Sequence, residues 1–92
     1  MTPGNPAHRT RAQQLTAAAQ THGWTRGMGV ESWSVSAYRW LDDGRCLIVI
    51  GNPLGWWWRV ADRGHPVASG DEPCDTADDA ITTAETAAEA TA

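Results

Sequence analysis

The chain has 92 residues and contains neither lysine nor phenylalanine. Its seven basic residues are all arginines, and alanine, glycine and threonine are abundant, as in a GC-rich coding sequence. Six tryptophans and one tyrosine supply every aromatic ring, so the tryptophans must provide most of the volume of a hydrophobic core. A chain of this length is enough for one small domain and leaves little for a second.

The sequence has few groups that bind metals or form disulfides. Cys46 lies in an apolar segment and Cys74 lies near the start of a helical pattern, so the two form neither a CxxC pair nor a disulfide framework. The three histidines show no ligand spacing with these cysteines. We therefore expect free thiols, no metal site and no cofactor.

Signals for export and membrane insertion are also missing. No apolar run approaches the length of a membrane span, and residues 1–6 lack the charged and apolar regions of a signal peptide. These absences predict a cytoplasmic protein that has no membrane partner.

Catalytic motifs are missing as well. The sequence has no Gly-x-Ser-x-Gly elbow. Ser32, Ser34 and Ser36 occupy every second position, which is typical of the solvent-exposed side of a strand. The adjacent carboxylates Asp42 and Asp43 precede a glycine, which is typical of a tight turn. We therefore expect that the protein is not an enzyme.

Helical patterns occupy both ends of the sequence. The first helix is expected from Pro6 or Thr10 to His22, over about 6–22, with Gly23 as its left-handed C-terminal cap and residues 1–5 disordered before it.

The second helix is expected over about 77–90. Thr76 and Asp79 resemble a capping box, and an alanine stripe that includes Ile81 follows them. Residues 6–92 would then form a single small domain of the α+β class.

Between the helices the sequence alternates with the period of β-strands and predicts a four-stranded antiparallel meander. The strands are expected at about 31–41, 45–51, 55–62 and 65–71, and residues 25–30 are interpreted as a linker. Both helices are expected to pack on this sheet.

Two-residue turns at Asp43-Gly44 and Pro53-Leu54 would fix the cross-strand partners. One face would then carry the rows Tyr38-Val49-Trp58 and Trp40-Leu47-Val60-Val67, and the other face Arg39-Ile48-Arg59-Ala68 and Ala37-Ile50-Trp57. Two arginines in one row would repel and resist burial, so we expect the first face to form the core, with Trp40 and Trp58 as its main stabilising rings.

The second face has more aromatic and arginine side chains than folding requires, which is the composition enriched at protein interfaces. The candidate binding residues are Trp33, Arg39, Ile48, Trp57 and Arg59. They predict a non-enzymatic interaction module that binds a protein partner or forms a homodimer. The alternative is that the amino-terminal helix covers this face.

Single-stranded nucleic acid is a second candidate partner, because tryptophans on a sheet can stack bases while arginines contact phosphates. The arginines in question are Arg39, Arg45, Arg59 and Arg63. Residues 1–70 hold seven arginines and four acids, but residues 71–92 hold seven acids and no base. The acidic end competes for the arginines and the chain as a whole carries −4, so nucleic acid is not favoured.

The run Trp56-Trp57-Trp58-Arg59-Val60, followed by Val67-Ala68-Ser69-Gly70 and an alanine-rich helix, resembles small uncharacterised tryptophan-rich strand-strand-helix proteins of actinobacteria and their phages. The resemblance covers about two-fifths of the chain. It implies a strand-strand-helix arrangement and a phage or mobile-element origin, and it assigns no activity to any residue.

Overall fold

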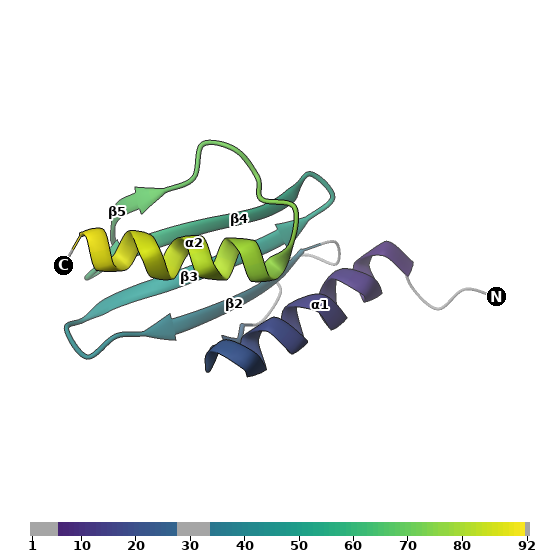
Figure 1. Cartoon of the computed structure of the whole chain (residues 1–92), viewed down its shortest axis with the longest axis horizontal. Helices are drawn as coiled ribbons and strands as arrows, with labels where there is room; N and C mark the ends of the chain where they lie inside the picture. Colours follow the sequence, from purple (N-terminus) through teal and green to yellow (C-terminus); the bar gives the residue numbers. More distant parts are fainter. Residues whose placement is uncertain (1–5, 28–33, 92) are drawn as a thin grey trace.

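The computed structural model describes residues 6–27 and 34–91 of the chain (Figure 1). The elements are α1 (Pro6–His22), β1 (Thr25–Arg26), β2 (Val35–Trp40), β3 (Arg45–Asn52), β4 (Gly55–Asp62), β5 (His65–Ser69) and α2 (Ala77–Ala90). The strands form one antiparallel sheet in the order β1-β2-β3-β4-β5, and both helices pack side by side on the same face of it (Figure 1). The α+β class and the antiparallel meander are confirmed.

The sheet has five strands and not the four that the sequence predicts. Thr25 pairs with Tyr38, and Arg26 pairs with Ala37, in a segment that was expected to be a linker. Two residues are too few for a periodic pattern, so nothing in the composition of this segment distinguishes it from a loop. The expected disordered segment 1–5 and the predicted strand residues 31–33 lie outside the described residues.

The ends of α1 follow the predicted signals. Gly23 has a φ of +76°, and the Trp24 amide donates to the Ala19 carbonyl over 2.8 Å, which is the longer hydrogen bond of a Schellman cap. Trp24 therefore folds back against the helix, where its ring is buried. Leu15 and Ala19 are buried in the same core as this ring.

The start of α2 is capped by Thr76, whose hydroxyl accepts a hydrogen bond from the Asp79 amide over 3.1 Å. One stripe of the helix is buried against the sheet and includes Ile81, which has no exposed surface. The other members of the stripe are alanines. Because their side chains are small, they leave space between the helix and the sheet for tryptophan rings.

The register of β3 with β4 is as predicted, since Val49 pairs with Trp58 and Leu47 with Val60. The predicted register of β2 with β3 is wrong by one residue, because Tyr38 pairs with Ile48 and not with Val49. A slip of one residue moves every side chain of a strand to the other face.

The turn between β2 and β3 explains the slip. The Leu41 amide donates to the Arg45 carbonyl over 2.8 Å, and the Gly44 amide donates to the Leu41 carbonyl over 3.2 Å, which closes a three-residue loop in place of the expected two-residue turn. Gly44 has the positive φ, +92°, that such a loop requires after its type I turn. Asp43 accepts from the Arg45 amide over 3.1 Å and holds the loop in this shape.

The core lies between the sheet and the two helices. Its largest fully buried side chains are Leu15, Leu47, Val49, Val60 and Ile81. Trp56 is buried there as well, with Trp58 half-buried beside it, whereas Trp40 is 64% exposed. The expectation that Trp40 is a core ring is therefore wrong, and its cause is the slip in register.

Candidate protein-interaction surface

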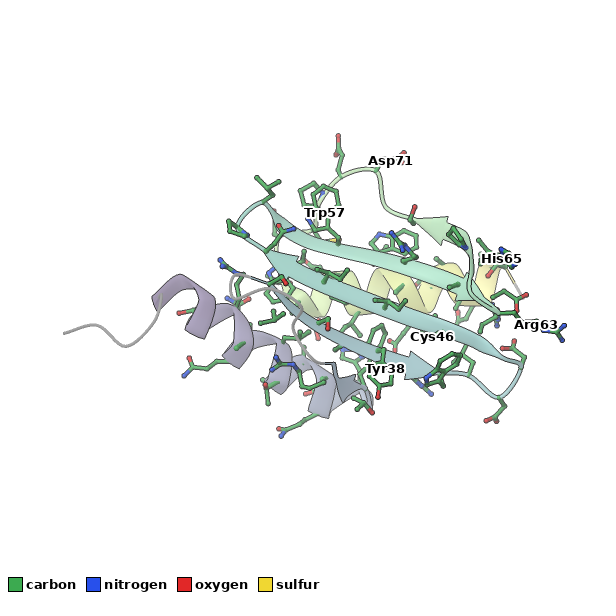
Figure 2. All side chains as sticks on the ribbon, turned by 180° about the vertical axis from the view of Figure 1, so that it is seen from behind. Tyr38, Cys46, Trp57, Arg63, His65 and Asp71 are labelled. Carbon is green, nitrogen blue, oxygen red and sulfur yellow. The ribbon has the colours of Figure 1, made fainter. Side chains whose placement is uncertain are left out.

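No described element covers the second face of the sheet, which Figure 2 shows with the helices behind it. Successive side chains of a strand point to opposite faces, so this surface receives every second residue of β2, β3 and β4. We call it the open face, and its residues are Ser36, Tyr38, Trp40, Cys46, Ile48, Ile50, Trp57, Arg59 and Ala61.

The open face is largely apolar. Trp40 and Ile50 are 64% and 39% exposed, and Trp57 is partly exposed as well. Arg59 is the one charged side chain among the residues of this face, and none of them is acidic. An exposed apolar surface with little charge is typical of a surface that contacts another molecule.

The two registers align the open face in three rows. The rows are Trp40–Cys46–Ala61, Tyr38–Ile48–Arg59 and Ser36–Ile50–Trp57, each reading from β2 across β3 to β4. In the first row the large ring is on β2 and the small side chain is on β4. In the third row this order is reversed.

A shallow hollow of about 330 Å³ lies on the β2 side of the open face. Tyr38 and Trp40 form its walls, while Cys46 and Ile48 contribute to its lining. Burial raises the pKa of the Cys46 thiol, so this group stays protonated and acts as a small apolar side chain. The hollow therefore suits an apolar group better than an electrophile.

Three of the five predicted binding residues, Ile48, Trp57 and Arg59, lie together on the open face. Arg39 does not, because the shifted register places it on the helix-covered side, where it donates to Glu85. Trp33 lies outside the described residues. Sequence reasoning missed Tyr38 and Trp40, and the signal that could have found them is the Asp42-Asp43-Gly44 run, which also fits a three-residue loop.

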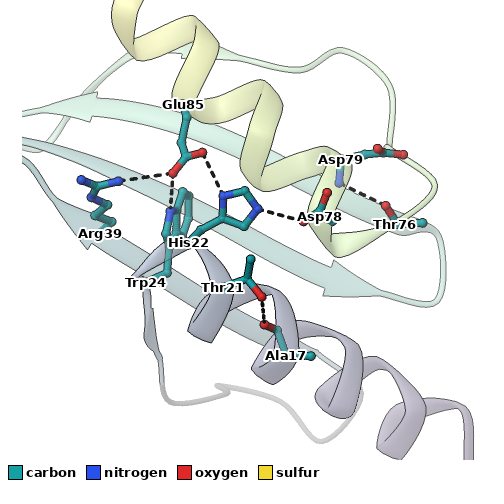
Figure 3. Close-up of polar contacts among 9 residues, drawn as sticks. All are labelled: Ala17, Thr21, His22, Trp24, Arg39, Thr76, Asp78, Asp79 and Glu85. Carbon is teal, nitrogen blue, oxygen red and sulfur yellow. Dashed lines mark hydrogen bonds and ion pairs between the residues drawn. The ribbon is translucent and has the colours of Figure 1, made fainter.

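A cluster of polar side chains joins the helices on the covered side (Figure 3). The Glu85 carboxylate accepts hydrogen bonds from Trp24 Nε1 over 3.1 Å and from Arg39 Nη1 over 3.3 Å. Its other oxygen lies 3.1 Å from His22 Nδ1, and His22 Nε2 lies 2.8 Å from the Asp78 carboxylate.

Both ring nitrogens of His22 are therefore bound to carboxylates of α2. The hydrogen bond to Asp78 and the charges of Glu85 and Asp78 raise the pKa of His22, although partial burial opposes them. A protonated imidazole donates to both carboxylates at once. The cluster accordingly holds α1 against α2, and it leaves neither imidazole nitrogen available to a ligand.

Three arginines are held on the covered side or at its edge. Arg39 pairs with Glu85, and Arg45 pairs with Asp43 over 2.8 Å. Arg26 donates to the hydroxyl of Thr16 over 2.6 Å. These three guanidinium groups are therefore not placed to meet a ligand on the open face.

Within the described ranges, no three His, Cys, Asp or Glu side chains gather where they could hold a metal ion. Neither of the helices in the described part of the chain is long and apolar enough to cross a membrane. Comparison of the chain with protein-family models, with curated proteins and with solved structures gave no match.

Proposed function

We propose that the protein is a non-enzymatic interaction module that binds a protein partner, or a second copy of itself, through the open face. The observation that carries the proposal is the pair of tryptophans on a sheet face that no described element covers, Trp40 and Trp57, with Arg59 beside them. Tryptophan and arginine are the residue types that most often dominate binding energy at protein interfaces. A phage or mobile-element origin and a cytoplasmic location stay predictions.

The distribution of arginines favours a protein ligand over single-stranded nucleic acid. Tyr38, Trp40 and Trp57 resemble the rings of a base-stacking platform. Such platforms need several cations along the strand path, because each neutralised phosphate adds to the affinity. Of the four arginines predicted to contact phosphates, Arg39 and Arg45 are engaged in ion pairs, which leaves Arg59 on the face and Arg63 at its edge.

A photo-crosslinking amino acid placed at position 50 tests the proposal. Ile50 is partly exposed on the central strand of the open face, and Thr82 on the solvent side of α2 is the matched control position. Irradiation of purified protein and of an extract of the source cells should give a discrete adduct from position 50 and none from position 82. An adduct with a protein other than this chain supports the proposal once that protein is identified and the complex is reconstituted from purified components.

The absence of any adduct at position 50, together with a failure to associate at high concentration, would overturn the proposal. Titration with a single-stranded oligonucleotide at about 50 mM salt forms the second arm. If the oligonucleotide quenches tryptophan fluorescence and the quenching weakens as salt is added, the ligand of the open face is nucleic acid and not a protein. We expect no such quenching.

A further inference from the structure

The open face has a pattern that matches itself. We infer that it packs against the open face of a second copy of the chain, with a twofold axis running along β3 between the two sheets. This inference rests on the proposed function and names the partner. Sheets that pack face to face lie about 10 Å apart and interdigitate their side chains, so a flat apolar face is a suitable partner for another.

The axis follows from the place of β3 in the sheet. β3 is the third of five strands, so a half-turn about a line parallel to it sets β3 on β3 of the second copy and exchanges β2 with β4. The three rows of the open face keep their level under this rotation, and each row is read in reverse on the second copy.

Reversal of the rows brings large groups opposite small ones. Trp40 faces Ala61 of the second copy in the first row, and Trp57 faces Ser36 of the second copy in the third row. Ile50 faces its own equivalent at the axis. Alternation of large and small side chains across facing positions is what allows two layers to interdigitate without voids.

The same rotation gives the charged residue a partner. Arg59 and Tyr38 stand at opposite ends of the middle row, so each Arg59 lies over Tyr38 of the other copy. A guanidinium over an aromatic ring is attracted by the π-electrons of the ring, by about 0.5 to 2 kcal/mol depending on how far it is desolvated. The interface thus contains no unpartnered charge and no pair of like charges.

The twist of the sheets keeps each row at its own level and shifts the two outer rows sideways by about 3 Å, which is less than the spacing of the strands. Packed sheets cross at about 30°, and β2 and β4 are each about 4.8 Å from β3. The resulting displacement along the strands is about 2 Å at β2 and β4, whereas neighbouring rows are about 6.6 Å apart. Each side chain therefore remains nearest to the row at its own level.

The other twofold arrangement has its axis across the strands at the level of the middle row, and it is disfavoured by charge. It would set the middle row on itself in the same order, so that Arg59 faced Arg59 of the second copy and Tyr38 faced Tyr38. Two guanidinium groups held together in a desolvated interface cost several kcal/mol. The axis along β3 avoids this contact.

The small size of the face favours a weak dimer. β3 and β4 have eight residues each, so the sheet measures about 26 Å along these strands and about 20 to 24 Å across them. The footprint is about 500 to 600 Å² on each copy and about 1,000 to 1,200 Å² in total, which is at the lower limit of specific interfaces. We expect a reversible dimer with a Kd of order 10 µM.

Sedimentation velocity from about 1 to about 200 µM, a range that spans the expected Kd, measures this equilibrium. Ile50→Asp sets two carboxylates against each other at the axis and should weaken the dimer about 100-fold. Thr82→Asp makes the same change on the exposed side of α2 and should leave the Kd unchanged. Thermal melts of both variants at low concentration verify that each monomer is folded.

Exchange of charges between Tyr38 and Arg59 tests the direction of the axis. Tyr38→Arg places a guanidinium over Arg59 of the second copy and should weaken the dimer about tenfold or more. The double variant Tyr38→Arg with Arg59→Glu pairs opposite charges across the interface and should return the Kd to within about threefold of the parent. With the axis across the strands, like charges would still face each other at both positions, so the double variant would stay as weak as Tyr38→Arg.

The outcomes separate this inference from the proposed function. A monomer at every concentration overturns the inference, and so does a dimer that Ile50→Asp leaves intact or that the double variant does not restore. If the protein is monomeric but position 50 crosslinks to a foreign protein that is then rebuilt from purified components, the proposed function stands without the homodimer. If position 50 yields no adduct and the protein stays monomeric, both fail.

Discussion

The ring of Trp56 lies against the backbone of Gly51, its partner in the β3–β4 ladder. A Cβ placed on Gly51 would come within 2.3 Å of the six-membered ring of Trp56. The ring is buried, so it has little room to move aside. Glycine at this position therefore lets a tryptophan lie flat on the sheet beneath the helices.

We predict that Gly51→Ala lowers the free energy of unfolding by about 1 to 3 kcal/mol, because it overpacks the core. Urea unfolding measures the change. Thr82→Ala on the exposed side of α2 is the control and should remain within about 0.5 kcal/mol of the parent. If Gly51→Ala were as stable as the parent, the Trp56 ring would not lie on this strand.

A second prediction concerns two tryptophans of very different burial. Trp56 is 4% exposed and Trp40 is 64% exposed. Trp56→Ala should cost about 3 to 5 kcal/mol through the lost burial and the cavity, whereas Trp40→Ala should cost less than about 1 kcal/mol. The measurement is urea unfolding at about 1 µM, where the expected dimer is dissociated. Equal costs for the two variants would contradict the register of β2.

The sequence predicts the fold well where local signals agree with the tertiary structure. Pro6 and Gly23 define the ends of α1 because capping is a property of the local backbone. The β3–β4 register was also predictable, since Pro53 and Gly55 permit few turns. The β2–β3 register was not, because an Asp-Asp-Gly run fits loops of two and of three residues, and only packing of the whole sheet decides between them.

The candidate site was predictable to the same extent. Trp57, Arg59 and Ile48 belong to the correctly registered part of the sheet, so their shared face followed from alternation alone. Arg39 was assigned to the wrong face together with its strand. The contact of Glu85 with His22 joins residues 63 positions apart, and no local pattern indicates such a contact.

A third prediction concerns pH, and it follows from His22. Its pKa is raised in the folded protein by the hydrogen bond to Asp78 and by the nearby Glu85. A raised pKa means that the folded state binds the proton more tightly than the unfolded state, whose value is about 6.5. The stabilisation is therefore complete below about pH 6.5 and is lost as the pH rises through the pKa of the folded protein.

The test compares unfolding free energies of the parent and of His22→Gln between about pH 6 and about pH 9. At the lower pH the variant should be less stable by about 1 to 3 kcal/mol, because it loses hydrogen bonds between charged groups. The difference should shrink as the pH rises. Thr82→Ala, which removes no titratable group from the exposed side of α2, should keep the slope of the parent, and a constant difference between parent and His22→Gln would refute the linkage.

The last prediction concerns the docking of α2 on the sheet through its buried stripe. Glu85 and Glu89 repel weakly at a spacing of four residues, whereas the alanine stripe and Ile81 are buried against the sheet. Ile81→Asp puts a carboxylate into this core and should destabilise the fold by about 2 kcal/mol or more. Glu89→Gln, on the exposed side of the same helix, should change stability by less than about 0.5 kcal/mol.

Because α2 covers the face opposite to the open face, an Ile81→Asp variant that melts like the parent would mean that residues 77–90 do not dock. Only α1 would then cover that face, β4 would be uncovered on both sides, and binding could not be assigned to the open face alone.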